Sequence, residues 1–374
     1  MKVAIFSFDF DCTFGTGNMT YELCHEFAKK AVDFVLFLPK VEKNRSSFKG
    51  DYPFETRYIL PPQITSLKDR HFWEYFKVIN LSGFTLVHSL FEFPHCFMAA
   101  FCAKRNKLPF IMGAQGTYGV LPLTQWPNKY FLKWSYDQAK EIIVPSQFTK
   151  EKIREYAKKD YRISVIHNGV NFSRFDSKPD FENLKDKYKN HKILLTVGAL
   201  IPRKGQDLVI KALPKIKERY PEIKYLLVGD GRMRQAWEKL ADDLGLSEQV
   251  EFLGKVAADE LVKYFHLGDI YVHTPRVINL SFEGFGLVYL EASACAKPIV
   301  ATDAGGIRDA VIDNQTGLIV ADGDIDGISD KVIYLLDHDD LKKQLGENGR
   351  EYAKKHDWPI IANEFIDHYQ KYSL

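Results

Sequence analysis

Short apolar runs alternate with longer segments of helical period along almost the whole chain. This alternation is typical of βαβ units, in which a parallel sheet is covered by helices. In the first half it predicts strands at Val3–Phe8, Phe34–Leu38, Thr85–His88, Phe110–Gly113, Glu141–Val144 and Ser164–Ile166. The helices predicted between these strands are Asn18–Ala31, Leu67–Asn80, Phe97–Lys104, Tyr130–Gln138 and Gln147–Lys159.

The same pattern restarts in the second half of the chain. It predicts strands at Lys192–Gly198, Tyr225–Gly229, Val250–Leu253, Ile270–His273 and Pro298–Thr302. The predicted helices include Gln206–Tyr220 and Met233–Leu244. Between the halves, Phe172–Asn190 is polar and charged and contains Pro179, which is typical of a linker between domains.

These patterns predict an α/β protein with two doubly wound parallel-sheet domains that face each other across a cleft. The expected domains are residues 1–175 and 176–357, and the last segment, 358–374 with its helix Trp358–Tyr369, is expected to pack back on the first domain. In such sheets ligands bind beyond the carboxyl ends of the strands. A cleft between two of them could hold two substrates.

Composition and charge agree with a globular protein of two domains. The 374 residues are 45% hydrophobic and 27% charged, with a formal net charge of +2, so no global field attracts nucleic acid. The first 180 residues hold 25 Lys/Arg against 18 Asp/Glu, and the remainder holds 26 against 31. The basic first half could bind an anionic lipid or an acidic acceptor, although chance variation of the surface gives the same counts.

The cysteines and the N-terminus favour a cytoplasmic setting. The chain has five cysteines and no CxxC pair, which favours neither a metal site nor a disulfide framework. The cysteines are Cys12, Cys24, Cys96, Cys102 and Cys295. The first residues, MKVAIFSFDF, resemble a strand and not a signal peptide. The longest uncharged stretch, Leu108–Asn128, holds three glycines and three prolines, so we expect at most contact with a membrane surface.

The most specific motif runs from Ser281 to Glu291. Two glutamates, Glu283 and Glu291, enclose seven residues that include Gly284 and Gly286, and a helix is expected to begin near Leu287. The glycines allow a ligand to approach the backbone, and the free N–H groups at the helix start favour a diphosphate. An acidic loop before an ordinary helix remains the alternative.

A basic turn follows the first strand of the second domain. Arg203 and Lys204 stand at the carboxyl end of this strand and ahead of a helix, where they could neutralise phosphate oxygens. A solvated basic turn is the alternative. In the first domain, Gly15 and Gly17 could cradle a phosphate, but this loop is not GxGxxG and no acidic ribose ligand ends the second strand.

Two polar clusters follow strands of the first domain. The segment Gly113–Gly119 carries Gln115 and Tyr118, and His88 ends the strand before it. We expect His88 and Tyr118 on the acceptor side of a site, although lone histidines are often core residues. No carboxylate cluster has the spacing of a metal site, because residue 333, where a calcium loop beginning at Asp322 would need a glutamate, is an isoleucine.

Aromatic and basic residues interleave in two segments. Lys68–Lys77 and Lys129–Lys140 could each lie on a membrane surface with rings down and cations at the level of the head groups. The pattern favours the plainer alternative, an amphipathic helix that packs on its own sheet.

Taken together, the motifs resemble family 4 of the retaining, nucleotide-sugar-dependent glycosyltransferases over nearly the whole chain. The resemblance is strongest in VGALIPRKGQDLVIKAL, LLVGDGRMRQAWEKLADDLGL, VEFLGKV and EGFGLVYLEASACAKPIVATDAGGIRDAVIDNQTGLIV, and VIHNGVN is similar to the interdomain turn of that family. It implies the GT-B fold of two Rossmann-like domains. It also implies transfer of a hexose-type sugar from a nucleotide-diphosphate sugar with retention of configuration and without a metal or other cofactor.

The resemblance also implies roles for single residues in donor binding. Glu283 would face the hydroxyls of the donor sugar, and Glu291 would bind the donor ribose. Backbone amides around Phe285, Gly286 and Leu287 would hold the diphosphate with the help of the cations of the basic turn. Val256 would border the base.

Two departures from the family pattern affect the site. Gln115 stands where the family usually has a histidine that contacts the donor sugar, and Ala199 stands where an arginine often follows the strand glycine. Glutamine can still hydrogen-bond a sugar hydroxyl but cannot act as an acid or base near neutral pH. In the mechanism favoured for the family the leaving phosphate takes the acceptor proton, so no enzymic base is needed. Gly15 and Gly17 would approach the donor phosphate and the acceptor.

Three other functions remain open on the sequence. The departures leave room for a non-catalytic glycosyltransferase-like protein that binds a sugar nucleotide. A nucleotide-sugar epimerase of the same fold and an NAD-dependent oxidoreductase are further alternatives. The basic, aromatic first half favours a membrane-associated acceptor, such as a lipid-linked glycan in polysaccharide or glycolipid biosynthesis.

Overall fold

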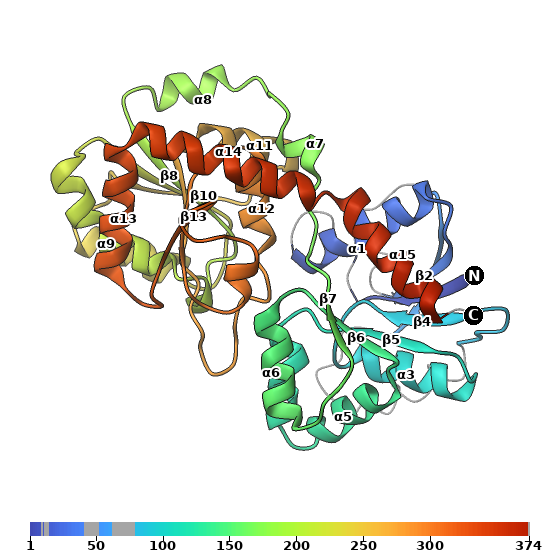
Figure 1. Ribbon diagram of the computed structural model, residues 1–374. Helices are drawn as coiled ribbons and strands as arrows, with labels where there is room; N and C mark the ends of the chain where they lie inside the picture. The colour runs from blue at the N-terminus through green and yellow to red at the C-terminus, as the bar shows by residue number, and fades with distance from the viewer. Residues whose placement is uncertain (9, 11–14, 41–51, 62–78, 373–374) are drawn as a thin grey trace. The chain divides into compact units, whose positions relative to one another are not determined.

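The computed structural model describes residues 1–8, 10, 15–40, 52–61 and 79–372. They divide into two compact units, of which unit 1 is Met1–Asn168 with Trp358–Leu374 and unit 2 is Gly169–Asp357 (Figure 1). Each unit holds one sheet in which every pair of neighbouring strands is parallel, and this agrees with the predicted α/β class.

The sheet of unit 1 has seven strands in the order β3-β2-β1-β4-β5-β6-β7. Its strands are β1 (Lys2–Phe6), β2 (Asp33–Pro39), β3 (Glu55–Leu60), β4 (Leu86–Ser89), β5 (Phe110–Gly113), β6 (Glu141–Val144) and β7 (Ile163–Val165). Its helices are α1 (Gly15–Lys29), α3 (His95–Arg105), α4 (Thr117–Val120), the 3-10 helix η2 (Leu121–Thr124), α5 (Asn128–Gln138), α6 (Gln147–Ala157) and α15 (Trp358–Tyr372). The order reverses between β1 and β4, which is the doubly wound arrangement that sequence analysis predicted.

The strand β3 was missed by the sequence analysis because it lies at the edge of the sheet. Most of its side chains are only half-buried, so the continuous apolar run that marks a central strand is lacking. The predicted helix Leu67–Asn80 and the basic segment Lys68–Lys77 lie almost wholly outside the described residues.

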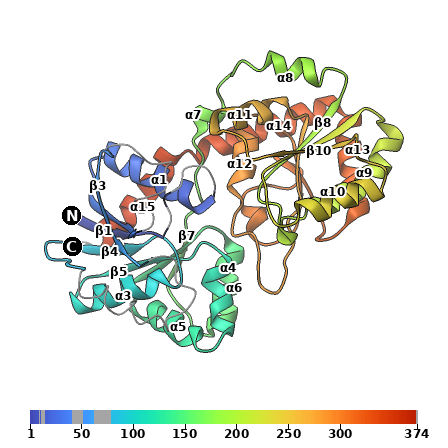
Figure 2. The same cartoon turned by 180° about the vertical axis from the view of Figure 1, so that it is seen from behind.

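The C-terminal helix α15 packs within unit 1, beside α1, while α3 and α5 lie on the opposite face of the sheet (Figure 2). Tyr369 of α15 shares a hydrogen bond of 2.7 Å with His88 of β4. His368 lies 2.6 Å from the carboxylate of Glu141 at the start of β6. A buried apolar side (Trp358, Ile361, Ala362, Phe365 and Tyr369) completes the contact.

The sheet of unit 2 has six strands in the order β10-β9-β8-β11-β12-β13. Its strands are β8 (Lys192–Val197), β9 (Ile223–Val228), β10 (Val250–Gly254), β11 (Ile270–His273), β12 (Ile299–Thr302) and β13 (Gly317–Val320). Its helices are α7 (Phe172–Phe175), α8 (Glu182–Lys187), η3 (Pro202–Lys204), α9 (Gln206–Arg219), α10 (Arg234–Asp243), α11 (Ala258–Leu267), α12 (Leu287–Ala294), η4 (Gly306–Asp309), α13 (Ile325–Asp337) and α14 (Asp339–Lys355).

Two apolar cores lie on the two faces of this sheet. Ile193, Leu195 and Val197 of β8 point to the core beneath α11 and α12, whereas Leu194 points to the core beneath α9, α10 and α13. This alternation follows from the period of two residues in a strand. Both faces are covered, so the strands read as continuous apolar runs.

The interpretation of Phe172–Asn190 as a linker was wrong. This segment forms α7 and α8 of unit 2, where Phe175 and Tyr188 are buried in the apolar core. The structural boundary falls between Asn168 and Gly169, ahead of the predicted position at residue 175. Val170 lies with unit 2 because its N–H donates at 2.9 Å to the carbonyl of His356, a residue of unit 2 that is distant in sequence.

Candidate functional site

The carboxyl ends of β8 and β11 lie side by side in unit 2, because these parallel strands are neighbours. After β8 the chain turns through η3 and reaches Gly205, which has φ +72°. A Cβ atom on Gly205 would lie 1.8 Å from the Thr274 carbonyl oxygen, so only glycine fits. This close approach holds Lys204 against the segment that follows β11.

The backbone of Glu283 is held by a second glycine turn. Its carbonyl accepts a hydrogen bond of 2.8 Å from the Gly306 N–H. A Cβ on Gly305, with φ +78°, would lie 2.4 Å from the same carbonyl oxygen. The loop after β12 therefore fixes the position from which the Glu283 side chain extends.

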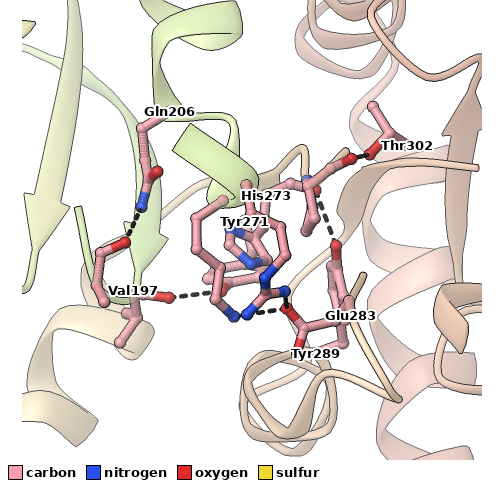
Figure 3. A network of polar contacts seen from close by, with 11 residues as sticks. Val197, Gln206, Tyr271, His273, Glu283, Tyr289 and Thr302 are labelled. Atoms are coloured by element: carbon pink, nitrogen blue, oxygen red, sulfur yellow. Dashed lines mark hydrogen bonds and ion pairs between the residues drawn. The ribbon is translucent and has the colours of Figure 1, made fainter. Parts of the chain in front are cut away.

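The three charged side chains form one compact cluster. Glu283 Oε2 lies 2.6 Å from Lys204 Nζ and 2.7 Å from Arg203 Nη1 (Figure 3). Only 13% of the Glu283 side chain is exposed, against 14% for Lys204 and 20% for Arg203. The turn after β8 and the loop before α12, which are about 80 residues apart in sequence, thus bring together three predicted site residues.

Burial and the neighbouring charges shift the pKa values of Glu283 and Lys204. Burial alone would raise the pKa of Glu283, but Lys204 and Arg203 outweigh burial, so the pKa lies far below its usual range. Burial lowers the pKa of Lys204, and the nearby Arg203 lowers it further, against the opposing effect of Glu283. The cluster holds two cations and one carboxylate, so it carries surplus positive charge for an anionic ligand.

The predicted diphosphate segment lies at the start of α12. Gly286 has φ +91° and precedes the helix, and as a glycine it offers no side chain to cap the first turn. Phe285 is buried in the core of unit 2, so only its backbone is available to a ligand, and Leu287 is partly buried. Glu291 lies about one turn into α12 and is partly exposed.

Val256 lies in the loop between β10 and α11. Its side chain is partly buried and packs on the core of unit 2, while the neighbouring Lys255 is exposed. The role of Val256 at the base therefore stays a prediction.

His273 is a site residue that sequence reasoning missed. It is fully buried at the end of β11, and neither ring nitrogen has a hydrogen-bond partner among the described residues. Burial and the charge of Lys204 hold the pKa of His273 well below its usual value, so the ring is neutral. The available sequence signal was a histidine that ends a strand directly before a site segment. The Tyr289 hydroxyl fixes this strand end by donating to the His273 carbonyl at 2.9 Å (Figure 3).

In unit 1, two of the predicted residues follow β5, with Gln115 in the loop before α4 and Tyr118 in α4 itself. Gln115 is partly buried, and its backbone N–H donates to the carboxylate of Glu92 at 2.8 Å. Tyr118 is 60% exposed. Sequence reasoning missed Glu92, since an isolated glutamate in an aromatic segment gives no motif.

The acceptor-side interpretation of His88 is corrected by the structure. His88 is fully buried beneath α15, with Nδ1 held by Tyr369, so it has no surface for an acceptor. The strong burial lowers its pKa to about 3, aided by the nearby His368.

Gly15, with φ +63°, begins α1 after the first strand, and Gly17 is buried in its first turn.

The described ranges contain neither a metal-binding cluster nor a membrane-spanning helix. No group of three or more His, Cys, Asp or Glu residues in these ranges could hold a metal ion together. No helix within the same ranges combines the length and apolar character needed to span a bilayer.

Comparisons with known proteins place the chain in a family. The model of "Glycosyl transferases group 1" matches residues 177–352, and the model of "Glycosyltransferase Family 4" matches residues 15–174. An uncharacterised glycosyltransferase of Methanocaldococcus jannaschii is 30% identical over 75% of this chain and 74% of its own length. The chain therefore belongs to glycosyltransferase family 4.

More distant similarities concern a mannosyltransferase and two solved structures. A GDP-mannose-dependent alpha-(1-6)-phosphatidylinositol monomannoside mannosyltransferase of Mycolicibacterium smegmatis is 32% identical over 58% of each chain. HepE of Anabaena, solved with UDP, has a TM-score of 0.83 at 18% identity and covers 99% of this chain and 100% of its own. Sucrose-phosphate synthase of Thermosynechococcus elongatus has a TM-score of 0.80 at 21% identity, covering 99% and 98%. These structures show that the fold is GT-B.

Proposed function

We propose that this protein is a retaining glycosyltransferase that moves a hexose-type sugar from a nucleotide-diphosphate sugar to an acceptor hydroxyl without a metal. The observation that carries the proposal is the cluster of Arg203, Lys204 and Glu283 at the carboxyl edge of the second sheet. A diphosphate leaving group needs charge stabilisation, and this cluster and the start of α12 supply it from preorganised groups.

In the structure the two cations are paired with Glu283. A donor diphosphate would compete for the same cations, because phosphate oxygens are strong acceptors for lysine and arginine. Glu283 would then be available to accept from the hydroxyls of the sugar. We infer that binding of the diphosphate and orientation of the sugar are coupled through this exchange of partners.

The transfer step needs no enzymic base. The bond between the anomeric carbon and the diphosphate oxygen breaks, and the acceptor oxygen forms its bond on the same face. The acceptor proton passes to a departing phosphate oxygen. Lys204 and Arg203 stabilise the charge on the leaving group, while Gln115 hydrogen-bonds the sugar in place of the family's histidine.

The acceptor is proposed to be a glycan or glycolipid presented at a membrane. The mycobacterial relative acts on a phosphatidylinositol monomannoside. In unit 1, Tyr118, Trp126 and Tyr130 are 60%, 76% and 59% exposed, and Lys129 Nζ lies 4.9 Å from the ring centre of Tyr130. Exposed aromatic rings beside lysines favour contact with head groups.

The test is a transfer assay with UDP-glucose and GDP-mannose, in which the anomeric configuration of the product is read by proton NMR. Lys204→Ala and Glu283→Gln should each lower kcat by about 100-fold or more. The control, Lys215→Ala, removes a half-exposed cation of α9 and should leave kcat unchanged. With a lipid acceptor in vesicles, Trp126→Ala should reduce the rate more than it does with a soluble acceptor.

An inverted product would contradict the retaining mechanism. Turnover of both site variants at the wild-type rate would contradict the role of the cluster. Tight binding of a nucleotide sugar without turnover on any acceptor would instead identify the non-catalytic binding protein, which the replacements at Gln115 and Ala199 leave as the second candidate.

A further inference from the structure

Glu92 is a buried carboxylate at the ligand-binding edge of the first sheet. It follows β4, and Gln115 follows β5, which is the next strand in the sheet. Only 6% of Glu92 is exposed, and no Lys or Arg within the described residues forms an ion pair with it. A carboxylate in such surroundings requires other hydrogen-bond donors.

Backbone amides of the next loop supply these donors. The Gln115 N–H donates to Glu92 Oε2 at 2.8 Å. The backbone N–H groups of Tyr118 and of Glu92 itself also lower the pKa of the carboxyl group. Gly116, which precedes α4, has no side chain to cap this turn, and Glu92 instead holds the backbone just before the helix through the Gln115 N–H, 23 residues away in sequence.

The same loop fixes the direction of the Gln115 amide. Gln115 Nε2 donates to the Leu90 carbonyl at 3.4 Å, while the buried Oε1 has no partner in the described structure. The two strand ends are packed without slack, since a Cβ on Gly113 would lie 2.1 Å from the Leu90 oxygen. Gln115 therefore presents an acceptor oxygen in a fixed position.

We propose that Glu92 is a positioning residue, which holds the loop before α4 so that Gln115 Oε1 accepts a hydrogen bond from a hydroxyl of the transferred sugar. This inference rests on the proposed function and deepens it, because it states which hydrogen-bonding partner the sugar must offer. A buried acceptor that receives a hydroxyl discriminates strongly against a sugar that lacks this hydroxyl.

A carboxylate suits this role better than a neutral group. It offers only acceptor atoms to the converging N–H groups, whereas a carboxamide or a protonated acid brings a donor to the same place. Burial raises the pKa of Glu92 against the opposing effect of the backbone amides. Cys96 of α3 and Tyr136 of α5 interact electrostatically with Glu92, and burial raises the pKa of both, so neither ionises in the acid range.

The test compares Glu92→Gln with Glu26→Gln, a control that removes an equally buried carboxylate, 6% exposed, from α1. With UDP-glucose or GDP-mannose as donor, E92Q should lower kcat at least tenfold and leave the Kd of UDP and GDP within about twofold. The wild type should lose kcat on acidification as Glu92 protonates, and E92Q should lack this acid limb. E26Q should match the wild type in kcat.

Wild-type kcat with an unchanged acid limb in E92Q would overturn the inference, as would an equal loss of kcat in E26Q. If E92Q does not fold, Glu92→Asp takes its place, since it keeps the charge but not the reach. E92D should lower kcat and retain the acid limb, and wild-type kcat in E92D overturns the inference. Failure of the wild type to turn over any donor overturns the proposed function, and the inference falls with it.

Discussion

Buried ionisable residues behave differently according to what surrounds each side chain. Glu283 faces two cations and stays ionised, whereas Glu92 accepts from a backbone amide and pairs with no cation among the described residues. His88 and His273 both lie in strands and are both fully buried. The sequence around His88 looks like that of a histidine that faces a ligand. The residue that covers the His88 ring, Tyr369, comes about 280 residues later in the chain, so the local sequence does not show the contact. Such long-range contacts leave no trace in a local pattern.

Glu141 provides a residue-scale prediction of pH dependence. Its carboxylate accepts from Ser164 Oγ at 2.5 Å and lies 2.6 Å from His368 Nδ1 of α15. Burial raises the pKa of Glu141, but these partners lower it more, to about 2 from the model-compound value of 4.5. The folded pKa lies below the unfolded value, so the stabilisation is complete above about pH 5 and is lost as the pH falls through 4.5 toward 2.

Glu141→Gln should therefore lower the free energy of unfolding by about 3 kcal/mol at pH 7. The difference between wild type and E141Q should shrink as the pH falls from about 4.5. Urea denaturation followed at several pH values measures this. Glu155→Gln, at an exposed pair with Lys152, is the control and should cost under about 0.5 kcal/mol. A difference for E141Q that does not depend on pH would contradict the account.

At the scale of elements, the sequence predicted central strands and their helices well. Apolar runs such as Ile270–His273 and Phe110–Gly113 agree with the observed strands, since strands buried on both faces leave a continuous signal. The edge strand Glu55–Leu60 and the short helices of Phe172–Asn190 were missed. Their stability depends on tertiary packing more than on local pattern, as the buried Phe175 and Tyr188 show.

The turn before α9 gives an element-scale prediction, in which two glycines with similar backbones are compared. Gly205 (φ +72°) would place a Cβ 1.8 Å from the Thr274 oxygen, whereas Gly245 (φ +66°) has nothing within 4 Å. Gly245→Ala should lower the free energy of unfolding by about 1 kcal/mol through backbone strain alone. Gly205→Ala should lower the free energy of unfolding by more than Gly245→Ala does. It should also weaken binding of UDP or GDP at least tenfold, because the turn that carries Lys204 must move.

Thermal denaturation and calorimetric titration of the two variants measure these effects. Equal stability and equal nucleotide affinity in both would contradict the claim that the close approach at Gly205 positions Lys204.

At the scale of the whole molecule, the motifs predicted the two-sheet architecture and named Arg203, Lys204 and Glu283 as site residues, although not the ion pairs that join them. They could do so because glycine turns and charged strand ends are local in sequence. The sequence did not predict Glu92 and His273, since each acquires its surroundings from neighbouring strands. The predicted return of α15 to the first unit is confirmed, but the boundary near residue 175 was inexact, because Val170 is assigned to unit 2 by a contact distant in sequence.

The central claim is that Lys204, Arg203 and the start of α12 hold a nucleotide's diphosphate. Calorimetric titration of UDP and GDP into wild type, Lys204→Ala, Glu283→Gln and the control Lys215→Ala tests it most directly. K204A should raise Kd at least tenfold, which corresponds to a loss of about 1.4 kcal/mol of binding free energy. E283Q should bind at least as tightly as wild type, because the cations lose a competing carboxylate, and K215A should be unchanged. Wild-type affinity in K204A would contradict the account.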